Sequence, residues 1–394
     1  MFLAFNWFVD PFWIWDSPQV KHINLIKPYI HNNQRIFETN RLLRFHPEAL
    51  ILGTSREDLG IDPRHPAFAN FRTFNAAISS QPYMESKELL RAISDKGNAP
   101  RLVVFGLIYE HSYLRHARPP DDFTKDNFSD GHRLDLLFNA STLKFSLRTV
   151  AGNLWEEDAL WRITLNGFST NEYWTHIPGS QRVWAKKSER YYVFMDHEVA
   201  CKNTFVAGNG KDQPVSPMED LREAIAIAYR KGIDMRLFIG PAHARQWETL
   251  VASGLWGQFE EWKRMLIAMV EMEAIKAHAK PFPVWDFSGY NSVTEENFPP
   301  EKDTSTRMRF YFESCHYTPA TGDLVLDRIF NLSIPGRSVP DDFGVLLTKD
   351  NINSHLANIR RARERYRQTN PEDVAEIESL AREAATAKPC QSVK

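Results

Sequence analysis

The sequence has little of several features that would assign a protein to a special class. Its three cysteines, Cys201, Cys315 and Cys390, cannot all pair and have no metal-ligand spacing, which argues against a disulfide framework or a metal centre. The formal net charge is -2, so no global electrostatic attraction to nucleic acid exists. No apolar run reaches the about 20 residues that a membrane-spanning helix needs. We therefore expect no metal, no other cofactor and no nucleic-acid partner.

The composition is that of a globular protein with a sizeable core, since 43% of the residues are hydrophobic and 25% are charged. A chain of 394 residues could hold two or three average domains, although α/β folds often run larger as one unit. The eleven tryptophans and 26 phenylalanines suit core packing first and carbohydrate stacking second.

Strands and helices are predicted to alternate along most of the chain. Short apolar runs predict strands, and stretches with apolar residues at helical spacing predict helices between them. The predicted strands are 49–52, 71–77, 101–107, 234–240 and 283–287, and the predicted helices are 37–45, 83–95, 218–232, 256–278 and 322–330. This alternation predicts a three-layer, flavodoxin-like α/β fold with a parallel sheet between helices.

The predicted α/β domain spans residues 23–345, with an irregular insertion at about 111–215. Residues 1–22 form an aromatic segment whose first 15 residues are too short to span a membrane and lack the features of a signal peptide. Three interpretations of that segment remain open: the end of a membrane anchor, a peripheral membrane contact, or a strand covering the core. Residues 346–394 are predicted to form a charged helix and tail. Its arginine-rich run is either a solvated face or a contact with a membrane or partner.

A serine follows the first predicted strand. Gly53 ends the apolar run 49–52 and Ser55 lies just beyond it, where open α/β sheets bind their ligands. Far away in sequence, Glu313 precedes His316 by three residues, so its carboxylate could orient the imidazole and leave the other ring nitrogen to take a proton from Ser55. A nucleophile, a base and an orienting acid are the parts that covalent acyl transfer needs.

Other interpretations of these residues stay open. A Gly-x-Ser is most often a turn, and a Glu-x-x-His is most often a solvated helix face. Cys315 could act as a thiol nucleophile, although neighbours on an extended chain point to opposite faces. Asp286 could replace Glu313 as the orienting acid, His243 could line the site or serve a turn, and Arg56 could bind an anionic substrate or form an ion pair.

Several of these segments together resemble a known family. Gly53-Thr54-Ser55, Asn75-Ala76-Ala77, the strand 103–107 and Glu313-x-x-His316 look like blocks of the SGNH (GDSL-type) hydrolase superfamily. The segments 9–11, 50–56 and 316–319 extend the similarity to its membrane-anchored bacterial branch, which includes the D-alanyl transfer protein of lipoteichoic acid synthesis and the alginate O-acetylation proteins. The resemblance covers roughly residues 9–110 and 230–335.

The resemblance implies roles for individual residues. Ser55 would be the nucleophile, His316 the general base, and Glu313 would stand in place of the family's more usual aspartate. The Ser55 backbone N–H and donors near Asn75 and Ala76 would bind the oxyanion, with Gly53, Arg56 and His243 also lining the site. The chain departs from the family after its third strand, where the usual Gly-x-Asn-Asp is not present.

The resemblance also implies a function. It is serine-dependent acyl transfer or ester hydrolysis, with acetyl as the acyl group, on a cell-envelope or exported polysaccharide. The expected partners are an acylated glycan or small ester and a multi-pass membrane acyltransferase, with peripheral membrane contact through residues 1–15. The expected location is the periplasmic side of a bacterial envelope. Two alternatives remain: a catalytically inactive glycan-binding or scaffold protein of the same fold, and a cytoplasmic esterase.

Overall fold

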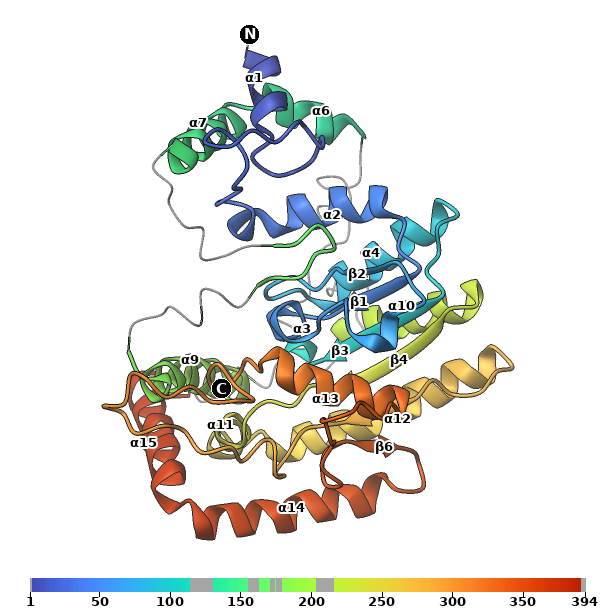
Figure 1. Ribbon diagram of the computed structural model, residues 1–394. Coiled ribbons are helices and arrows are strands. Elements are labelled where there is room, and N and C mark those ends of the chain that lie inside the picture. The colour runs from blue at the N-terminus through green and yellow to red at the C-terminus, as the bar shows by residue number, and fades with distance from the viewer. Residues whose placement is uncertain are drawn as a thin grey trace.

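The computed structural model describes residues 2–113, 130–154, 163–170, 174, 179–202 and 216–390. A six-stranded sheet of order β2-β1-β3-β4-β5-β6 lies at its centre (Figure 1). The strands are β1 (Ala49–Leu52), β2 (Thr73–Asn75), β3 (Leu102–Leu107), β4 (Asp234–Ile239), β5 (Val284–Asp286) and β6 (Val345–Leu347). The first five pair in parallel, and β6 pairs antiparallel to β5. The α/β class and the parallel sheet predicted from the sequence are therefore confirmed.

Helices precede, connect and follow these strands (Figure 1). The α-helices are α1 (Phe2–Val9), α2 (Gln34–Phe45), α3 (Ser55–Gly60), α4 (Tyr83–Asp95), α6 (Asp130–Phe138), α7 (Ala140–Leu154), α9 (Gln181–Lys202), α10 (Pro217–Lys231), α11 (Ala244–Ala252), α12 (Trp256–Lys276), α13 (Pro319–Phe330), α14 (Ile352–Thr369) and α15 (Pro371–Ala387). Three 3₁₀ turns, η1 (His31–Asn33), η2 (Pro66–Phe68) and η3 (Tyr109–Ser112), complete the described elements.

The two faces of the sheet bury separate cores. Successive residues of a strand point to opposite faces, so Leu50 and Leu52 of β1 pack with residues of α4, α10 and α12. Ala49 and Ile51 of the same strand pack instead with residues of α13. Every residue of β1, β2 and β3 is buried, as expected of parallel strands covered on both sides. The arrangement is that of three layers, helices on sheet on helices.

The predicted insertion contains more regular structure than the sequence indicated. Helix α9 runs for 22 residues through a stretch that we interpret as irregular from the sequence, so that interpretation is wrong for residues 181–202. Its buried residues include Gln181, Glu189 and Asp196, and these polar side chains interrupt the apolar period by which a helix is recognised. Residues 114–129 of the predicted insertion lie outside the described residues.

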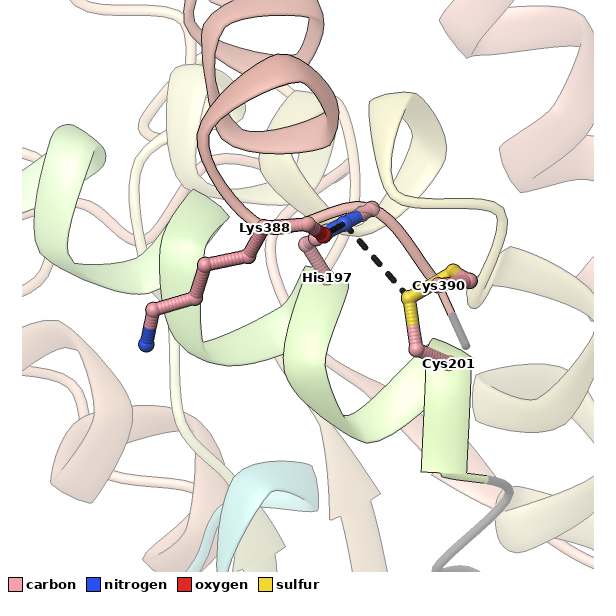
Figure 2. Close-up of a disulfide and its surroundings, with 4 residues drawn as sticks. All are labelled: His197, Cys201, Lys388 and Cys390. Atoms are coloured by element: carbon pink, nitrogen blue, oxygen red, sulfur yellow. Dashed lines mark hydrogen bonds between the residues drawn. A yellow bond between two sulfur atoms is a disulfide. The ribbon is translucent and has the colours of Figure 1, made fainter. Parts of the chain in front are cut away.

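The C-terminal segment is joined to the sheet. The predicted boundary between residues 345 and 346 divides β6, which pairs with β5. Two helices follow instead of one, because Pro371 opens α15 directly after α14 ends. A disulfide connects Cys201 at the end of α9 to Cys390 beyond α15 (Figure 2), a pairing that the cysteine spacing did not reveal.

The N-terminal segment folds as a helix, which rules out the strand interpretation. Helix α1 contacts α6 and α7, and the three lie together at one end of the molecule, beyond α2 (Figure 1). Phe2, Leu3 and Trp7 of α1 are 43%, 37% and 44% exposed. Among the described residues, no helix has the length and apolar character needed to cross a membrane.

Candidate active site

Ser55 occupies a fixed turn between β1 and α3. It is the first residue of the helix, and Thr54 caps the helix by accepting a hydrogen bond from the Arg56 N–H at 3.3 Å. In return, Glu57 accepts a hydrogen bond from the Thr54 N–H at 2.8 Å, which completes a capping box. The serine hydroxyl is thus held just past the carboxyl end of a buried parallel strand.

Three side chains from distant parts of the sequence meet at this turn. The Oγ atom of Ser55 lies 2.8 Å from Nε2 of His316, and Nδ1 of the same ring is hydrogen-bonded to the Glu313 carboxylate. That carboxylate also accepts the backbone N–H groups of Cys315 and His316, at 3.0 and 2.9 Å. The structure therefore places a hydroxyl, an imidazole and a carboxylate in the order that nucleophile, base and orienting acid require.

Glu313 is ionised although it is buried, with 2% of its surface exposed. Burial acts to raise its pKa, but the interaction with His316 and the hydrogen bonds to the carboxylate outweigh that effect and hold the pKa below its ordinary value. A carboxylate in this position keeps the proton of the ring on Nδ1. Nε2 is then left unprotonated toward Ser55, as a general base must be.

Buried Glu57 joins the Ser55 turn to the histidine segment. Its carboxylate accepts hydrogen bonds from the Thr54 N–H and from the hydroxyl of Tyr317, the latter at 3.1 Å. Gly53 and Gly106 make room for it, because a Cβ atom on either would lie 2.3 or 2.2 Å from the Glu57 side chain. Sequence reasoning missed this residue, and the Thr54-x-x-Glu57 capping box was the signal that could have found it.

The expected oxyanion donors are engaged elsewhere. The side-chain amide of Asn75 donates to the carbonyls of Glu57 and Ile61, both at 2.9 Å, and the Ala76 N–H donates to Ile51 at 2.9 Å. These bonds hold the end of β2 against α3 and β1, so neither residue has those donors free for an oxyanion.

The Ser55 N–H differs from these donors. It stands at the first position of α3, where a helix has no acceptor for its own N–H groups. Within the described residues it makes no hydrogen bond. It remains the one expected oxyanion donor that the geometry leaves available.

Arg56 and Cys315 form a buried pair behind the site. Arg56 is 1% exposed, with its guanidinium 3.3 Å from the carboxylate of Glu110 and 3.3 Å from the Cys315 sulfur. Of the two roles open from the sequence, the ion pair is the one that the geometry matches. Burial raises the pKa of the Cys315 thiol to about 12, which argues against a thiol nucleophile.

His243 and Asp286 are held by other partners. His243 caps α11, since Nδ1 accepts the Arg245 N–H at 3.1 Å and Nε2 lies 2.6 Å from the Glu296 carbonyl. Burial lowers the pKa of His243 to about 4, so the ring is neutral and serves the turn. Asp286 is bonded to Lys263 and His355, and Glu313 fills the orienting position instead.

The insertion contributes to the surroundings of the site. The ring of Trp174 stacks on Phe312 at 5.4 Å and lies 5.6 Å from the ring of His316. The Ser169 N–H donates to the backbone carbonyl of Asp58 in α3, at 3.2 Å. Trp174 and Phe312 therefore form an aromatic surface beside His316.

Two buried carboxyl groups, Glu38 and Asp58, lie near the site. Both are almost fully buried, and the Gln34 amide donates to Asp58 at 2.8 Å. Burial raises the pKa of Asp58 to about 7, and burial together with the charge of Asp58 raises the pKa of Glu38. At least one of the two is therefore protonated near neutral pH.

Two groups of described side chains have ligand-type atoms within 4.8 Å of one another: His197 with Cys201 and Cys390, and Glu313 with Cys315 and His316. In the first, both sulfurs belong to the disulfide. In the second, the positive Arg56 guanidinium contacts Cys315 and opposes a cation. Neither group argues for a metal centre.

Comparison with family models, with curated proteins and with solved structures returned no match for this chain. The functional argument therefore depends on the geometry of the site.

Proposed function

We propose that the protein is a serine-dependent acyltransferase or esterase that forms an acyl-Ser55 intermediate. The observation that supports this most directly is the contact between Ser55 Oγ and His316 Nε2 at 2.8 Å, with Glu313 on the other ring nitrogen. The position of Ser55 after β1 is also the one that the resemblance to SGNH hydrolases implies.

The reaction divides into two steps with the same base. His316 Nε2 takes the Ser55 proton as Oγ attacks the carbonyl carbon of an ester, and the Ser55 N–H faces the oxygen that becomes negative. His316 then returns the proton to the departing alcohol, leaving acyl-Ser55. In the second step His316 deprotonates an acceptor hydroxyl or water, which attacks the acyl carbon. The bond from that carbon to Oγ breaks, and His316 returns the proton to Ser55 Oγ.

The proposed substrate is an O-acetylated polysaccharide of the cell envelope or an exported glycan, and a multi-pass membrane acyltransferase is the proposed partner. The disulfide Cys201–Cys390 supports a location on the periplasmic side, because disulfides persist mainly in oxidising compartments. The exposed aromatic residues of α1 support a peripheral membrane contact there. Cell fractionation separates this location from the cytoplasmic alternative.

A second candidate function is glycan binding without catalysis. It is favoured by the engagement of Asn75 and Ala76 in structural hydrogen bonds, which leaves the oxyanion site with fewer donors than the resemblance implies. Trp174 beside His316 would then contribute an aromatic surface for a sugar ring.

Turnover of an activated acetyl ester, with intact mass measured after a short reaction, separates the two functions. We expect the parent protein to turn over and to carry an acetyl adduct, and Ser55→Ala to lose both. Cys315→Ala is the matched control, because it removes the thiol next to His316 and is expected to keep the adduct. Equal rates for parent and Ser55→Ala, with no adduct, would contradict acyl-serine chemistry and favour glycan binding.

A further inference from the structure

A polar cavity lies between β5 and α14, away from Ser55. Its volume is about 420 Å³, within the range of sites for small ligands. Asp286 ends β5, so the cavity opens at the carboxyl edge of the parallel strands, where α/β sheets bind ligands. Ser288, Tyr290, Asn291, Asn358 and other polar side chains line it together with His355, Arg361 and Arg365.

The floor of the cavity is a fixed acid–imidazole pair. Nε2 of His355 lies 2.8 Å from Asp286, and that carboxylate also accepts from Lys263 at 2.7 Å and from Ser288. Because an ionised carboxylate only accepts, Nε2 carries the proton. The Nδ1 atom of His355 makes no hydrogen bond to a described residue, and the side chain is 10% exposed. Nδ1 is thus available to accept a hydrogen bond from a ligand.

The arginines of α14 divide into two groups. Three of them have a carboxylate partner within the protein: Arg360 with Glu260 at 3.0 Å, Arg363 with Glu364 at 3.3 Å and Arg367 with Glu248 at 3.1 Å. Arg361 and Arg365 have no ion pair with a carboxylate of any described residue, and these are the two that line the cavity. The unpaired positive charge of the helix is therefore concentrated at this cavity.

The two acidic groups at the cavity both accept hydrogen bonds, and Asp286 is also paired with a cation. Asp342 at the cavity accepts two hydrogen bonds from Ser292, at 2.8 and 2.6 Å, and Asp286 is bonded to Lys263. The charge of Arg365 also acts on Glu295, but the two are not within ion-pair distance. An anion entering the cavity would meet the guanidinium groups of Arg361 and Arg365, with the Asp342 carboxylate also in the lining.

We propose that this cavity is a binding site for a small polar ligand whose phosphate or carboxylate group is held by Arg361 and Arg365, with a hydroxyl group of the ligand donating to Nδ1 of His355. Guanidinium groups suit both anions because their planar donors match two oxygens at once. The surrounding hydroxyl and amide side chains suit the polar remainder of such a ligand. This site does not involve Ser55, and the proposal does not depend on acyl transfer.

Calorimetric titration of the full chain with inorganic pyrophosphate and, separately, with citrate tests the proposal. We expect binding that Arg361→Gln and Arg365→Gln each weaken about tenfold or more. Arg360→Gln is the matched control, since it removes the same charge from the same helix outside the cavity, and it is expected to change affinity less than about twofold. Melting temperatures of all variants verify that they are folded.

Imidazole NMR signals give an independent measurement. The His355 signal, assigned by its loss in His355→Gln, is expected to shift on titration with the bound anion in the parent and not in Arg365→Gln. Binding of pyrophosphate alone would identify a phosphate ligand, and binding of citrate as well would extend the site to carboxylates. No binding of either anion, or equal weakening by Arg360→Gln, would overturn the proposal.

Discussion

The Glu313–His316 pair and the Asp286–His355 pair both join a buried carboxylate to an imidazole near the carboxyl edge of one sheet. In the first, the carboxylate accepts from the histidine and from backbone N–H groups, and the ring's other nitrogen meets a serine hydroxyl. In the second, the same carboxylate oxygen that contacts the histidine also binds the Lys263 ammonium.

The comparison shows that the role of an acid–histidine pair depends on the groups that contact its carboxylate and its ring. A lysine on the carboxylate neutralises the charge that would otherwise strengthen the imidazole as a base. Burial acts to raise the pKa of Asp286, yet Lys263 and His355 together lower it. The second pair therefore ties β5 to α12 and α14, whereas the first leaves its histidine directed at a nucleophile.

Replacing the acid by its amide should reduce activity at the first site and reduce stability at the second. Glu313→Gln is expected to reduce turnover of an acetyl ester by roughly 10³- to 10⁴-fold, because the ring then loses the partner that fixes its tautomer. Steady-state kinetics measure the loss, with circular dichroism as the control for folding. A decrease of less than about tenfold would mean that Glu313 does not orient His316 in the reaction.

Asp286→Asn is expected to destabilise the fold by about 3–5 kcal/mol, because it leaves the buried Lys263 ammonium without its counter-charge. Urea unfolding followed by tryptophan fluorescence measures this. A change below about 1 kcal/mol would show that the second pair does not hold the helices, and the contrast between the two sites would fail.

Ester turnover should not depend on the disulfide Cys201–Cys390, which links the segment after α15 to α9. The double variant Cys201→Ser/Cys390→Ser is expected to lose about 2–4 kcal/mol of stability, since the link closes a separation of 189 residues. Ester turnover is expected to stay within about twofold, because Glu57 and Tyr317 fix the segment locally. The parent protein under a dithiol reductant is the matched control. A parallel loss of activity would show that α9 transmits the restraint.

The smallest expected effect concerns Glu38 and Asp58, the two buried carboxyl groups near Ser55. The pKa of Asp58 is raised to about 7, so the folded state binds more protons than the unfolded state between about pH 4 and pH 7, and stability falls as pH rises through that range. Glu38→Gln removes one of the two like charges and should stabilise the protein by about 1–2 kcal/mol at pH 8.

That substitution should have no effect at pH 4, where both carboxyls are protonated. Urea midpoints measured across this range are the test. A pH-independent effect of Glu38→Gln would contradict a shared titration of Glu38 and Asp58.

Local sequence determined five of the six strands, most helices between them, and the three residues Ser55, Glu313 and His316 that meet at the site. The apolar run 49–52 followed by Gly53, and the Glu313-x-x-His316 spacing, are local patterns whose meaning depends on few distant contacts. The α/β alternation then fixes the edge of the sheet at which Ser55 lies. For these features the neighbouring residues along the chain carry the information.

Only the tertiary structure decided which polar groups remain free. The donors of Asn75 and Ala76 are used by α3 and β1, Arg56 is paired with Glu110, and Cys201 is joined to Cys390. Each of these partners lies on another element of the chain. A buried polar group must find a partner wherever the fold provides one, so its role depends on the complete packing and not on its sequence neighbours.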